Sequence, residues 1–172
     1  KVEESDLANK YLLELKDGNR IESVLMKHDY GLSLCVSSQI GCNMGCSFCE
    51  SGRLKKIRNL TLSEIVMQVT TVSEYENKRI DYIVMMGIGE PFDNFDTVKR
   101  FISVVTNNKM IGIGQRHLTI STCGIVPKIY EFADLETGVN LAISLHAPNN
   151  EIRDKIMKIN HAYKIEEIMS AL

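Results

Sequence analysis

The chain has 172 residues, of which 44% are hydrophobic and 24% are charged, and its formal net charge is −2. This composition is typical of one globular domain with a hydrophobic core, and it excludes a disordered or fibrous chain. The small net charge favours neither a nucleic-acid binder nor a membrane binder by bulk field, and no apolar run is long enough for a transmembrane helix.

The first part of the chain reads as a series of short strands. Residues 10–16 and 20–27 flank a turn signal, Asp-Gly-Asn at 17–19, and residues 32–38 form a third strand that leads into a cysteine-rich loop. We therefore expect a β-strand extension over residues 1–31, ahead of the main domain.

From residue 61 the pattern changes to helices alternating with apolar strands. Thr61 and Glu64 have the spacing of a capping box at a helix start. The later elements expected are a strand over 80–87, a helix over 95–106, a strand over 117–121, a short helix over 125–134, a strand over 139–146 and a helix from 163. The side chains expected to point inward are Ile65, Val66, Val69 and Val72 in the first helix, and Phe101, Val104 and Val105 in the second.

Strand, loop and helix thus repeat about four times, which predicts an α/β fold with a parallel sheet. Eight such units close a TIM-like barrel, so four units give only a part of one. We expect residues 32–172 to form the N-terminal part of such a barrel. The sequence begins with Lys1 rather than methionine, which suggests a piece of a longer protein.

Three of the five cysteines lie within eight residues, in the stretch GCNMGCSFCE at 41–50. An odd number of cysteines, behind a polar start with no apolar leader, favours a reducing cytoplasm over a disulfide framework. In that compartment clustered thiolates bind metal or react, so Cys42, Cys46 and Cys49 are candidate metal ligands.

The spacing Cys-x3-Cys-x2-Cys leaves a metal site one protein ligand short. Structural zinc normally takes four Cys or His ligands, and no fourth one follows within ten residues of the loop. A cubane [4Fe–4S] cluster fits better, because three thiolates leave one iron open to a small molecule. The four-thiolate spacing of bacterial ferredoxins is absent.

The loop, with Phe48 just before its last cysteine, resembles the signature loop of radical S-adenosylmethionine (SAM) enzymes. In that family the open iron of the [4Fe–4S] cluster binds the amino and carboxylate groups of SAM. The resemblance therefore implies both cofactors, a contact from Phe48, and a partial (β/α) barrel of the radical SAM type.

The run Gly-Ile-Gly-Glu-Pro at 87–91 ends a buried strand, at the edge where parallel α/β folds bind ligands. The resemblance implies that Gly89 and Glu90 hold the ammonium group of SAM. Taken alone, the run is explained equally well by a turn with a solvated glutamate.

Four blocks, in the family's order from about Arg20 to the last residue, resemble the RlmN-type methyltransferases that act on carbon 2 of adenine in ribosomal and transfer RNA. The blocks are CVSSQIGCNMGCSFC, MMGIGEPFDN, HLTISTCGIVPKIYEFAD and LAISLHAPNNEIRDKIMKIN. By position, Ser121, Ser144, Leu145 and His146 match family contacts to SAM. Without the resemblance, Ser121 reads as a helix N-cap and His146 as a loop histidine.

Two further residues match catalytic positions of the same family. Cys35 corresponds to a cysteine that resolves a covalent enzyme–RNA intermediate, and Glu22 to a glutamate proposed as a proton acceptor. By themselves, a cysteine on a strand is more often a buried hydrophobe, and a lone glutamate reads as surface.

The run Arg-Leu-Lys-Lys-Ile-Arg at 53–58 carries four cations and no acid. A solvated basic loop explains such a run as well as contact with RNA phosphates, which position a substrate without reading its sequence.

The resemblance also implies a reaction sequence. One SAM methylates a cysteine, a second SAM yields a 5′-deoxyadenosyl radical, and the methyl-cysteine radical adds to adenine before Cys35 releases the product. The methyl-carrying cysteine is expected beyond Leu172, no role is assigned to Cys123, and the family's N-terminal helical domain is expected outside this sequence. We therefore expect the chain alone to be inactive.

The implied partners are ribosomal RNA, transfer RNA and a reducing electron donor such as flavodoxin, with no membrane. One alternative is a Cfr-like enzyme that methylates carbon 8 of adenine in ribosomal RNA, although Pro91 favours the carbon-2 type. Another is a non-enzymatic iron–sulfur electron carrier or zinc module.

Overall fold

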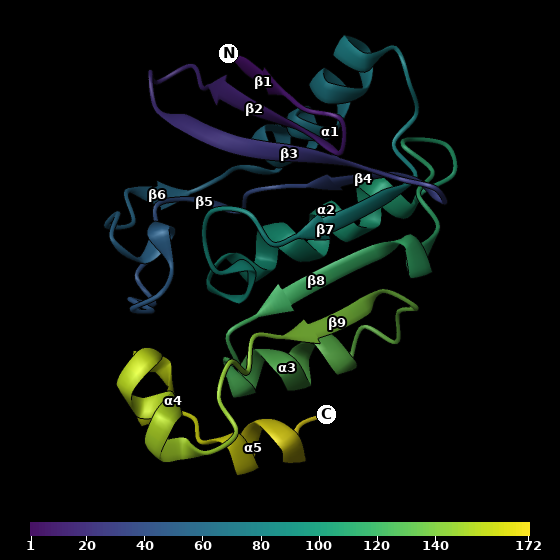
Figure 1. Cartoon of the computed structure of the whole chain (residues 1–172). Helices are drawn as coiled ribbons and strands as arrows, with labels where there is room; N and C mark the ends of the chain where they lie inside the picture. Colours follow the sequence, from purple (N-terminus) through teal and green to yellow (C-terminus); the bar gives the residue numbers. More distant parts are fainter.

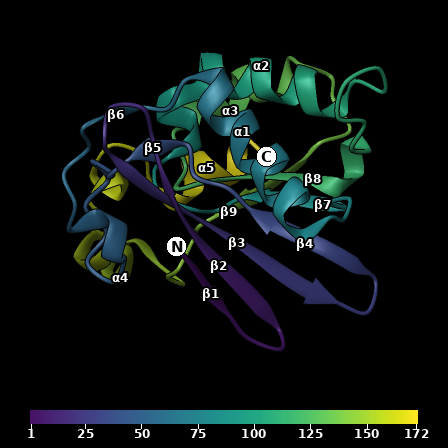
Figure 2. The ribbon, with the colours of Figure 1, turned by 90° about the horizontal axis from the view of Figure 1, so that it is seen from above.

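One mixed β-sheet organises the chain. The structure, a computed structural model, describes all of residues 1–172. Seven strands lie in the order β1-β2-β3-β4-β7-β8-β9, and helices α1, α2 and α3 cover one face of the sheet (Figures 1 and 2). The predicted α/β class is confirmed, because strands β4, β7, β8 and β9 run parallel to one another.

The sheet has an antiparallel and a parallel half. The antiparallel strands are β1 (Val2–Glu4), β2 (Ala8–Glu14), β3 (Arg20–His28) and β4 (Gly31–Cys35). The parallel half continues from β4 with β7 (Tyr82–Met85), β8 (Leu118–Thr122) and β9 (Asn140–Ile143). A separate two-stranded sheet pairs β5 (Gln39–Ile40) with β6 (Arg58–Asn59) and closes the base of the cysteine loop.

Five α-helices follow or connect the strands. They are α1 (Leu62–Glu76), α2 (Phe95–Thr106), α3 (Val126–Ala133), α4 (Asn150–Ile156) and α5 (Ile165–Ser170). Short 3-10 turns lie at Glu50–Gly52, Pro91–Asn94, Gln115–His117 and Lys158–His161. No helix has the length and apolarity needed to span a bilayer.

Local chemistry explains where the first helix begins. Thr61 is the N-cap of α1, its hydroxyl accepts from the backbone N–H of Glu64, and the Glu64 carboxylate accepts from the N–H of Thr61, so the predicted capping box is confirmed. The predicted limits of α2 also agree with the structure, but Val104 is only half-buried. The inward face of α2 is completed by Val98 and Ile102.

Three parts of the observed structure differ from the sequence prediction. Strands β1, β5 and β6 and helix α4 were not predicted. The predicted strand over 32–38 ends at Cys35, because the backbone N–H of Ser37 turns to the side chain of Gln68 on α1 (2.8 Å). The strand predicted over 139–146 ends at Ile143, which leaves residues 144–146 as a loop at the carboxyl edge of the sheet.

The register determines which side chains share a face. Val24 lies opposite Cys35, Cys35 opposite Val84, and Val84 opposite Thr119. Facing residues of paired strands project to the same side, and alternate residues along a strand do so too. Cys35 and Ser121 therefore point to the face that the three helices leave uncovered.

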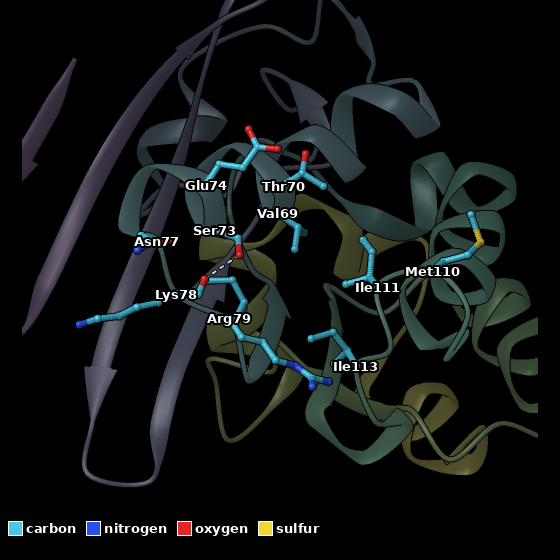
Figure 3. Close-up of a pocket in the computed structure, with 11 residues that line it drawn as sticks. Val69, Thr70, Ser73, Glu74, Asn77, Lys78, Arg79, Met110, Ile111 and Ile113 are labelled. Carbon is cyan, nitrogen blue, oxygen red and sulfur yellow. Dashed lines mark hydrogen bonds between the residues drawn. The ribbon is translucent and has the colours of Figure 1, made fainter.

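The amino ends of the parallel strands border a cavity of about 630 Å³, between the end of α1 and the segment 110–113 (Figure 3). Arg79 spans it by donating to the carbonyl of Gly112 (2.8 Å), and the hydroxyl of Ser73 donates to the carbonyl of Lys78 (2.6 Å). This cavity lies at the end of the sheet that serves stability rather than ligand binding in folds of this kind. The chemistry-bearing residues lie at the other end.

Candidate active site

A cavity of about 200 Å³ lies at the carboxyl ends of the parallel strands. It brings together nine of the residues predicted from the sequence, from four separate segments of the chain. These are Cys42, Cys46, Phe48, Cys49, Gly89, Glu90, Ser121, Ser144 and His146. The predicted Leu145 lies next to this set without lining the cavity. Residues as far apart in the sequence as Cys42 and His146 thus form one site of mixed thiol, carboxylate and hydroxyl character.

The cysteine loop is fixed at its base and along its length. Gly41 has φ +72°, and a Cβ there would stand 2.2 Å from the carbonyl oxygen of Lys55, so only glycine fits this crossing. The N–H of Cys42 donates to the carbonyl of Leu54 (3.0 Å), and the N–H of Ser47 donates to the carbonyl of Ile156 at the end of α4 (2.9 Å). The three thiols are therefore presented by an anchored loop, and each is half-buried.

The environment of Cys42 and Cys46 opposes the ionisation of these two thiols in the absence of a cation. Burial, followed by the neighbouring Cys49 and Cys42 thiols, raises the pKa of Cys46 to about 11, and burial also raises the pKa of Cys42. No three His, Cys, Asp or Glu side chains are grouped closely enough to hold a single metal ion. A cubane cluster would instead take the thiolates at separate corners, and its iron ions would oppose the local preference for the neutral thiol.

Glu90 is buried at the carboxyl end of β7, with 4% of its surface exposed. One carboxylate oxygen accepts from the N–H of Phe92 (3.0 Å) and the other from the N–H of Cys123 (2.8 Å). Burial raises the pKa of Glu90 above its ordinary value, although these hydrogen bonds oppose the shift. A buried carboxylate without a cationic partner in a cavity wall is suited to receive an ammonium group.

Gly89, the residue before Glu90, allows a close packing that holds Glu90 in place. It has φ +106°, and a Cβ there would stand 2.6 Å from Cβ of Gln39. Gln39 is fully buried, and its amide oxygen accepts from the N–H of Glu90 (2.9 Å). The glycine thus permits a close packing that also fixes the backbone of Glu90.

The far wall combines two hydroxyls and two rings. The hydroxyl oxygens of Ser121 and Ser144 lie 3.3 Å apart, so β8 and the end of β9 present a hydrogen-bonded pair of polar groups. The rings of Phe48 and His146 lie 4.6 Å apart between centroids, at an interplanar angle of 54°. Phe48 is 52% exposed, so this aromatic pair forms part of the rim. Leu145 contributes its carbonyl to Arg153 (3.1 Å) rather than a side chain to the cavity.

Cys35 and Glu22 lie on the same open face of the sheet, outside the cavity lining. Cys35 is at the carboxyl end of β4, and burial raises the pKa of its thiol, although a backbone hydrogen bond from Met86 opposes the shift. Glu22 is two residues from Val24, the residue opposite Cys35, and its carboxylate pairs with Lys10 (3.1 Å). The register thus places this thiol and this carboxylate on adjacent strands.

Cys123 occupies the cavity without resembling the three loop thiols. It is buried, its N–H donates to Glu90, and burial together with the Glu90 carboxylate raises the pKa of its thiol strongly. A thiol held neutral against a carboxylate is a poor nucleophile.

Half of the basic run over 53–58 has a structural role. The guanidinium of Arg58 binds both oxygens of Glu64 (2.8 Å each) as well as Asp17, and Lys56 pairs with Asp93 (2.7 Å). Arg53 pairs on the surface with Glu50, whereas Lys55 is exposed and forms no ion pair. Two of the four cations are therefore partly buried in ion pairs, and the other two are exposed.

The sequence prediction missed the buried polar residues that support the site. Gln39 holds the N–H of Glu90, Gln68 binds the backbone of Ser37 through both ends of its amide, and Arg153 binds carbonyls behind the cavity. Gln39 could have been suspected from its position directly before the loop. The other two lie on helices whose sequence pattern gives no sign of an inward polar side chain.

Comparison with known proteins finds a matching family model and many similar relatives. A model of the radical SAM superfamily matches residues 36–172. Similar relatives named probable dual-specificity RNA methyltransferase RlmN occur in Spiroplasma citri (56% identical over 97% of this chain), Acholeplasma laidlawii (58% over 95%) and Listeria welshimeri (53% over 99%). The chain spans 49%, 48% and 48% of these relatives, about half of their length.

A solved structure agrees with the sequence comparisons. A radical SAM methyltransferase from Sphaerobacter thermophilus superposes with a TM-score of 0.94 at 38% identity. The match covers 99% of this chain and 52% of that one. Sequence and backbone similarity therefore extend over nearly the whole chain.

Proposed function

Since this chain belongs to the radical SAM superfamily, we propose that it forms the cluster- and SAM-binding part of an enzyme that methylates carbon 2 of adenine in 23S ribosomal RNA and transfer RNA. The observation that carries the proposal is the single cavity in which three loop thiols meet a buried carboxylate and two strand-end hydroxyls. The names of the relatives support the choice of RNA as the substrate.

The residues present fit the two cofactors of the superfamily. Cys42, Cys46 and Cys49 provide three thiolates for a [4Fe–4S] cluster, and the same cavity is lined by polar groups suited to a further ligand. The uncompensated carboxylate of Glu90 suits the ammonium of SAM, and the close packing of Gly89 against Gln39 holds that carboxylate in place. Together these donor groups match a cluster with one iron left open to SAM.

The other wall would orient the rest of SAM. The paired hydroxyls of Ser121 and Ser144 can donate to its carboxylate or ribose, and the Phe48–His146 pair offers an aromatic surface. Leu145 would hold the loop between Ser144 and His146 in place, since its carbonyl accepts from Arg153 (3.1 Å). When bound, the cluster and SAM supply the carbon radical that an unreactive ring carbon requires. The protein's task at this wall is to hold SAM in one pose and to exclude water.

Two residues on the open sheet face would act on the RNA base. The Glu22 carboxylate would accept the proton from carbon 2 of the adenine ring, which is general-base chemistry. The Cys35 thiolate would then attack the sulfur of the cysteine that is bridged to the base through a methylene group and form a disulfide with it. The electron pair of the broken C–S bond would pass to the methylene carbon and the ring, and that carbon would take up a proton to complete the methyl group of the released base. Cys123 is unsuited to carry the methyl group, because its sulfur lies against Glu90.

Substrate and partners follow from the same proposal. Exposed Arg53 and Lys55 flank the loop and are placed to contact RNA phosphates, which would position the strand without reading its sequence. A reducing electron donor such as flavodoxin would serve the cluster, and the cytoplasm would be the compartment. We propose residues 32–172 as the first part of the catalytic barrel and residues 1–31 as its strand extension.

The first test concerns the cofactors. After anaerobic reconstitution with iron and sulfide, the reduced protein should give the EPR signal of a [4Fe–4S] cluster, and SAM should change that signal. A signal that SAM leaves unchanged would refute an open iron and leave an electron carrier as the better description.

The second test concerns the reaction. A chimera would carry this chain in place of the corresponding half of the Listeria welshimeri relative, with a matched chimera bearing Cys35→Ser. After incubation with SAM, a reductant and 23S ribosomal RNA or transfer RNA, the RNA would be digested to nucleosides and measured by mass spectrometry. We expect 2-methyladenosine from the first chimera only. Finding 8-methyladenosine would establish the carbon-8 alternative, and finding neither with an intact cluster signal would refute the substrate.

A further inference from the structure

Arg153 on α4 is a fully buried cation directly behind the candidate site, with 0% of its surface exposed. Its hydrogen bonds all go to uncharged oxygens. They are the carbonyls of Cys123 (2.6 Å), Leu145 (3.1 Å), Ser144 (3.5 Å) and Tyr163 (3.5 Å) and the amide oxygen of Asn160 (2.7 Å). Five N–H donors thus find five acceptors, and none of them is a carboxylate.

No acid near Arg153 neutralises it directly. Asp154 follows it in the chain, but that carboxylate pairs with Lys164 (3.0 Å) and accepts from the amide of Asn160 (2.7 Å). A buried charge is costly unless an opposite charge compensates it. The dipoles of the carbonyls offset part of this cost, but a net positive charge remains inside the protein.

The hydrogen bonds of Arg153 end on the backbone that shapes the cavity. Cys123, whose carbonyl binds the guanidinium, donates its N–H to Glu90 (2.8 Å). The carbonyl of Ser144 also accepts from the guanidinium (3.5 Å), and the hydroxyl of Ser144 pairs with that of Ser121 (3.3 Å). Arg153 therefore connects the ends of β8 and β9, which carry the contact with the Glu90 carboxylate and the pair of serine hydroxyls.

The charge also acts on the cysteine loop. The loop is bound to α4 through the N–H of Ser47 and the carbonyl of Ile156 (2.9 Å). The guanidinium lies on the same helix and is near enough to act electrostatically on the cysteine loop at Cys46. The negative charge of a cluster bound to the loop thiolates would thus compensate the positive charge of Arg153, which no carboxylate neutralises.

We propose that Arg153 is a positioning residue that fixes the ends of β8 and β9 and holds a positive charge behind the cysteine loop, where it stabilises the reduced, more negative form of the bound cluster. This inference rests on the proposed function, since it requires a cluster on the three loop thiolates. Reduction adds one electron to the cluster, so a nearby buried cation raises its reduction potential.

The choice of residue type agrees with this role. A guanidinium stays charged when it is buried and satisfies several carbonyls with one planar fork, whereas a lysine offers a point charge that loses its proton more readily. Burial lowers the pKa of Arg153, but arginine remains protonated in proteins. Lysine at this position would retain part of the charge and lose most of the hydrogen bonds.

The test compares four variants of the cluster-reconstituted protein with the unsubstituted protein. Arg153→Gln removes the charge and keeps an amide donor, Arg153→Met removes both, and Arg153→Lys keeps a charge without the fork. Lys155→Met is the matched control, because it removes a cation from the exposed side of the same helix. The midpoint potential would be measured by EPR during an anaerobic redox titration, and SAM binding would be measured separately.

We expect Arg153→Gln to lower the potential by at least about 59 mV, the equivalent of a tenfold change in the equilibrium constant of a one-electron couple. Arg153→Met should do the same if it folds, Arg153→Lys should give a smaller shift, and Lys155→Met should leave the potential unchanged. SAM should bind more weakly to all three Arg153 variants, because each loses the hydrogen bonds that fix Cys123 and Ser144.

Two results would overturn the inference alone. One is an Arg153→Gln potential within error of the Lys155→Met control, and the other is an Arg153→Lys shift as large as that of Arg153→Gln. The second result would mean that only the packing matters. Failure of the unsubstituted protein to assemble a cluster would instead overturn the proposed function and this inference together.

Discussion

Replacing Gly89 with alanine should damage the site more than the backbone strain alone explains. Gly89 combines two constraints, a φ of +106° and a close approach to Gln39 and Ser38. A Cβ at this position would stand 2.6 Å from Cβ of Gln39 and 2.8 Å from the hydroxyl oxygen of Ser38. Both neighbours are buried, so neither can move aside into solvent.

The two constraints can be given separate magnitudes. An L-residue held in a left-handed conformation costs roughly 1–2 kcal/mol. Overpacking in a filled interior adds about 1–3 kcal/mol. We therefore expect Gly89→Ala to lower the free energy of unfolding by about 2–5 kcal/mol.

Gly112→Ala is the matched control. Gly112 also has a positive φ, +74°, but the nearest atom to a Cβ there is 3.7 Å away. The Gly112→Ala substitution should therefore lower the free energy of unfolding only by the backbone strain, roughly 1–2 kcal/mol. Any change in the entropy of the unfolded chain is the same for both substitutions and cancels in the comparison.

Urea unfolding followed by circular dichroism would measure both variants, and thermal unfolding would provide a second measure. The difference of about 1–3 kcal/mol corresponds to a melting temperature roughly 2–12 °C lower for Gly89→Ala than for Gly112→Ala. Gly89→Ala should also lose the SAM-dependent change in the EPR signal, because displaced Gln39 no longer holds the N–H of Glu90 (2.9 Å). Equal losses of stability in the two variants would refute the reasoning from close packing.

Three further predictions concern the same end of the sheet. Gln68→Leu should lower the free energy of unfolding by roughly 2–5 kcal/mol in denaturant titrations, since it leaves the buried N–H (2.8 Å) and carbonyl (2.9 Å) of Ser37 unpaired; a loss under 1 kcal/mol would contradict this. Because burial raises the pKa of Glu90, the cofactor-free protein should lose stability as pH rises from the ordinary glutamate value through that raised pKa, while calorimetry should find SAM affinity increasing over the same interval; Glu90→Gln should abolish both trends. Cys46→Ser should lose most of the iron bound after anaerobic reconstitution, whereas Cys123→Ser, in the same cavity, should retain it; equal iron contents would remove Cys46 from the ligand set.

Much of the fold could be predicted because its signals are local. The capping box at Thr61 and the apolar spacing of α2 are visible within a few residues, and neither depends on distant packing. The short strands β5 and β6 could not be predicted from local signals. Each has only two residues, and they form a pair only when the cysteine loop between them closes. The end of β4 was misplaced for a similar reason, since Gln68, a residue 31 positions away, takes the N–H of Ser37.

The lining of the site was easier to predict than its supports. Residues such as Glu90, Ser121 and Ser144 follow apolar strands, and parallel strands bring their carboxyl ends to one edge. A supporting residue has no such marker. Arg153 lies in the charged stretch NEIRDKI, where an arginine normally faces solvent. Its burial depends on three carbonyls that come together only after β8 and β9 have paired.

The site is therefore held from two sides by buried polar groups. On one side Gln68 joins β3, α1 and the entry to the cysteine loop, through Ser23 (2.9 Å) and the backbone of Ser37. On the other side Arg153 joins β8, β9 and α4. Such groups are costly to bury and specify one arrangement only when every partner is present. Substitution of Gln68 or Arg153 should consequently weaken SAM binding even with all three loop cysteines intact. If only the residues that contact the cofactors determined binding, these substitutions would have no effect.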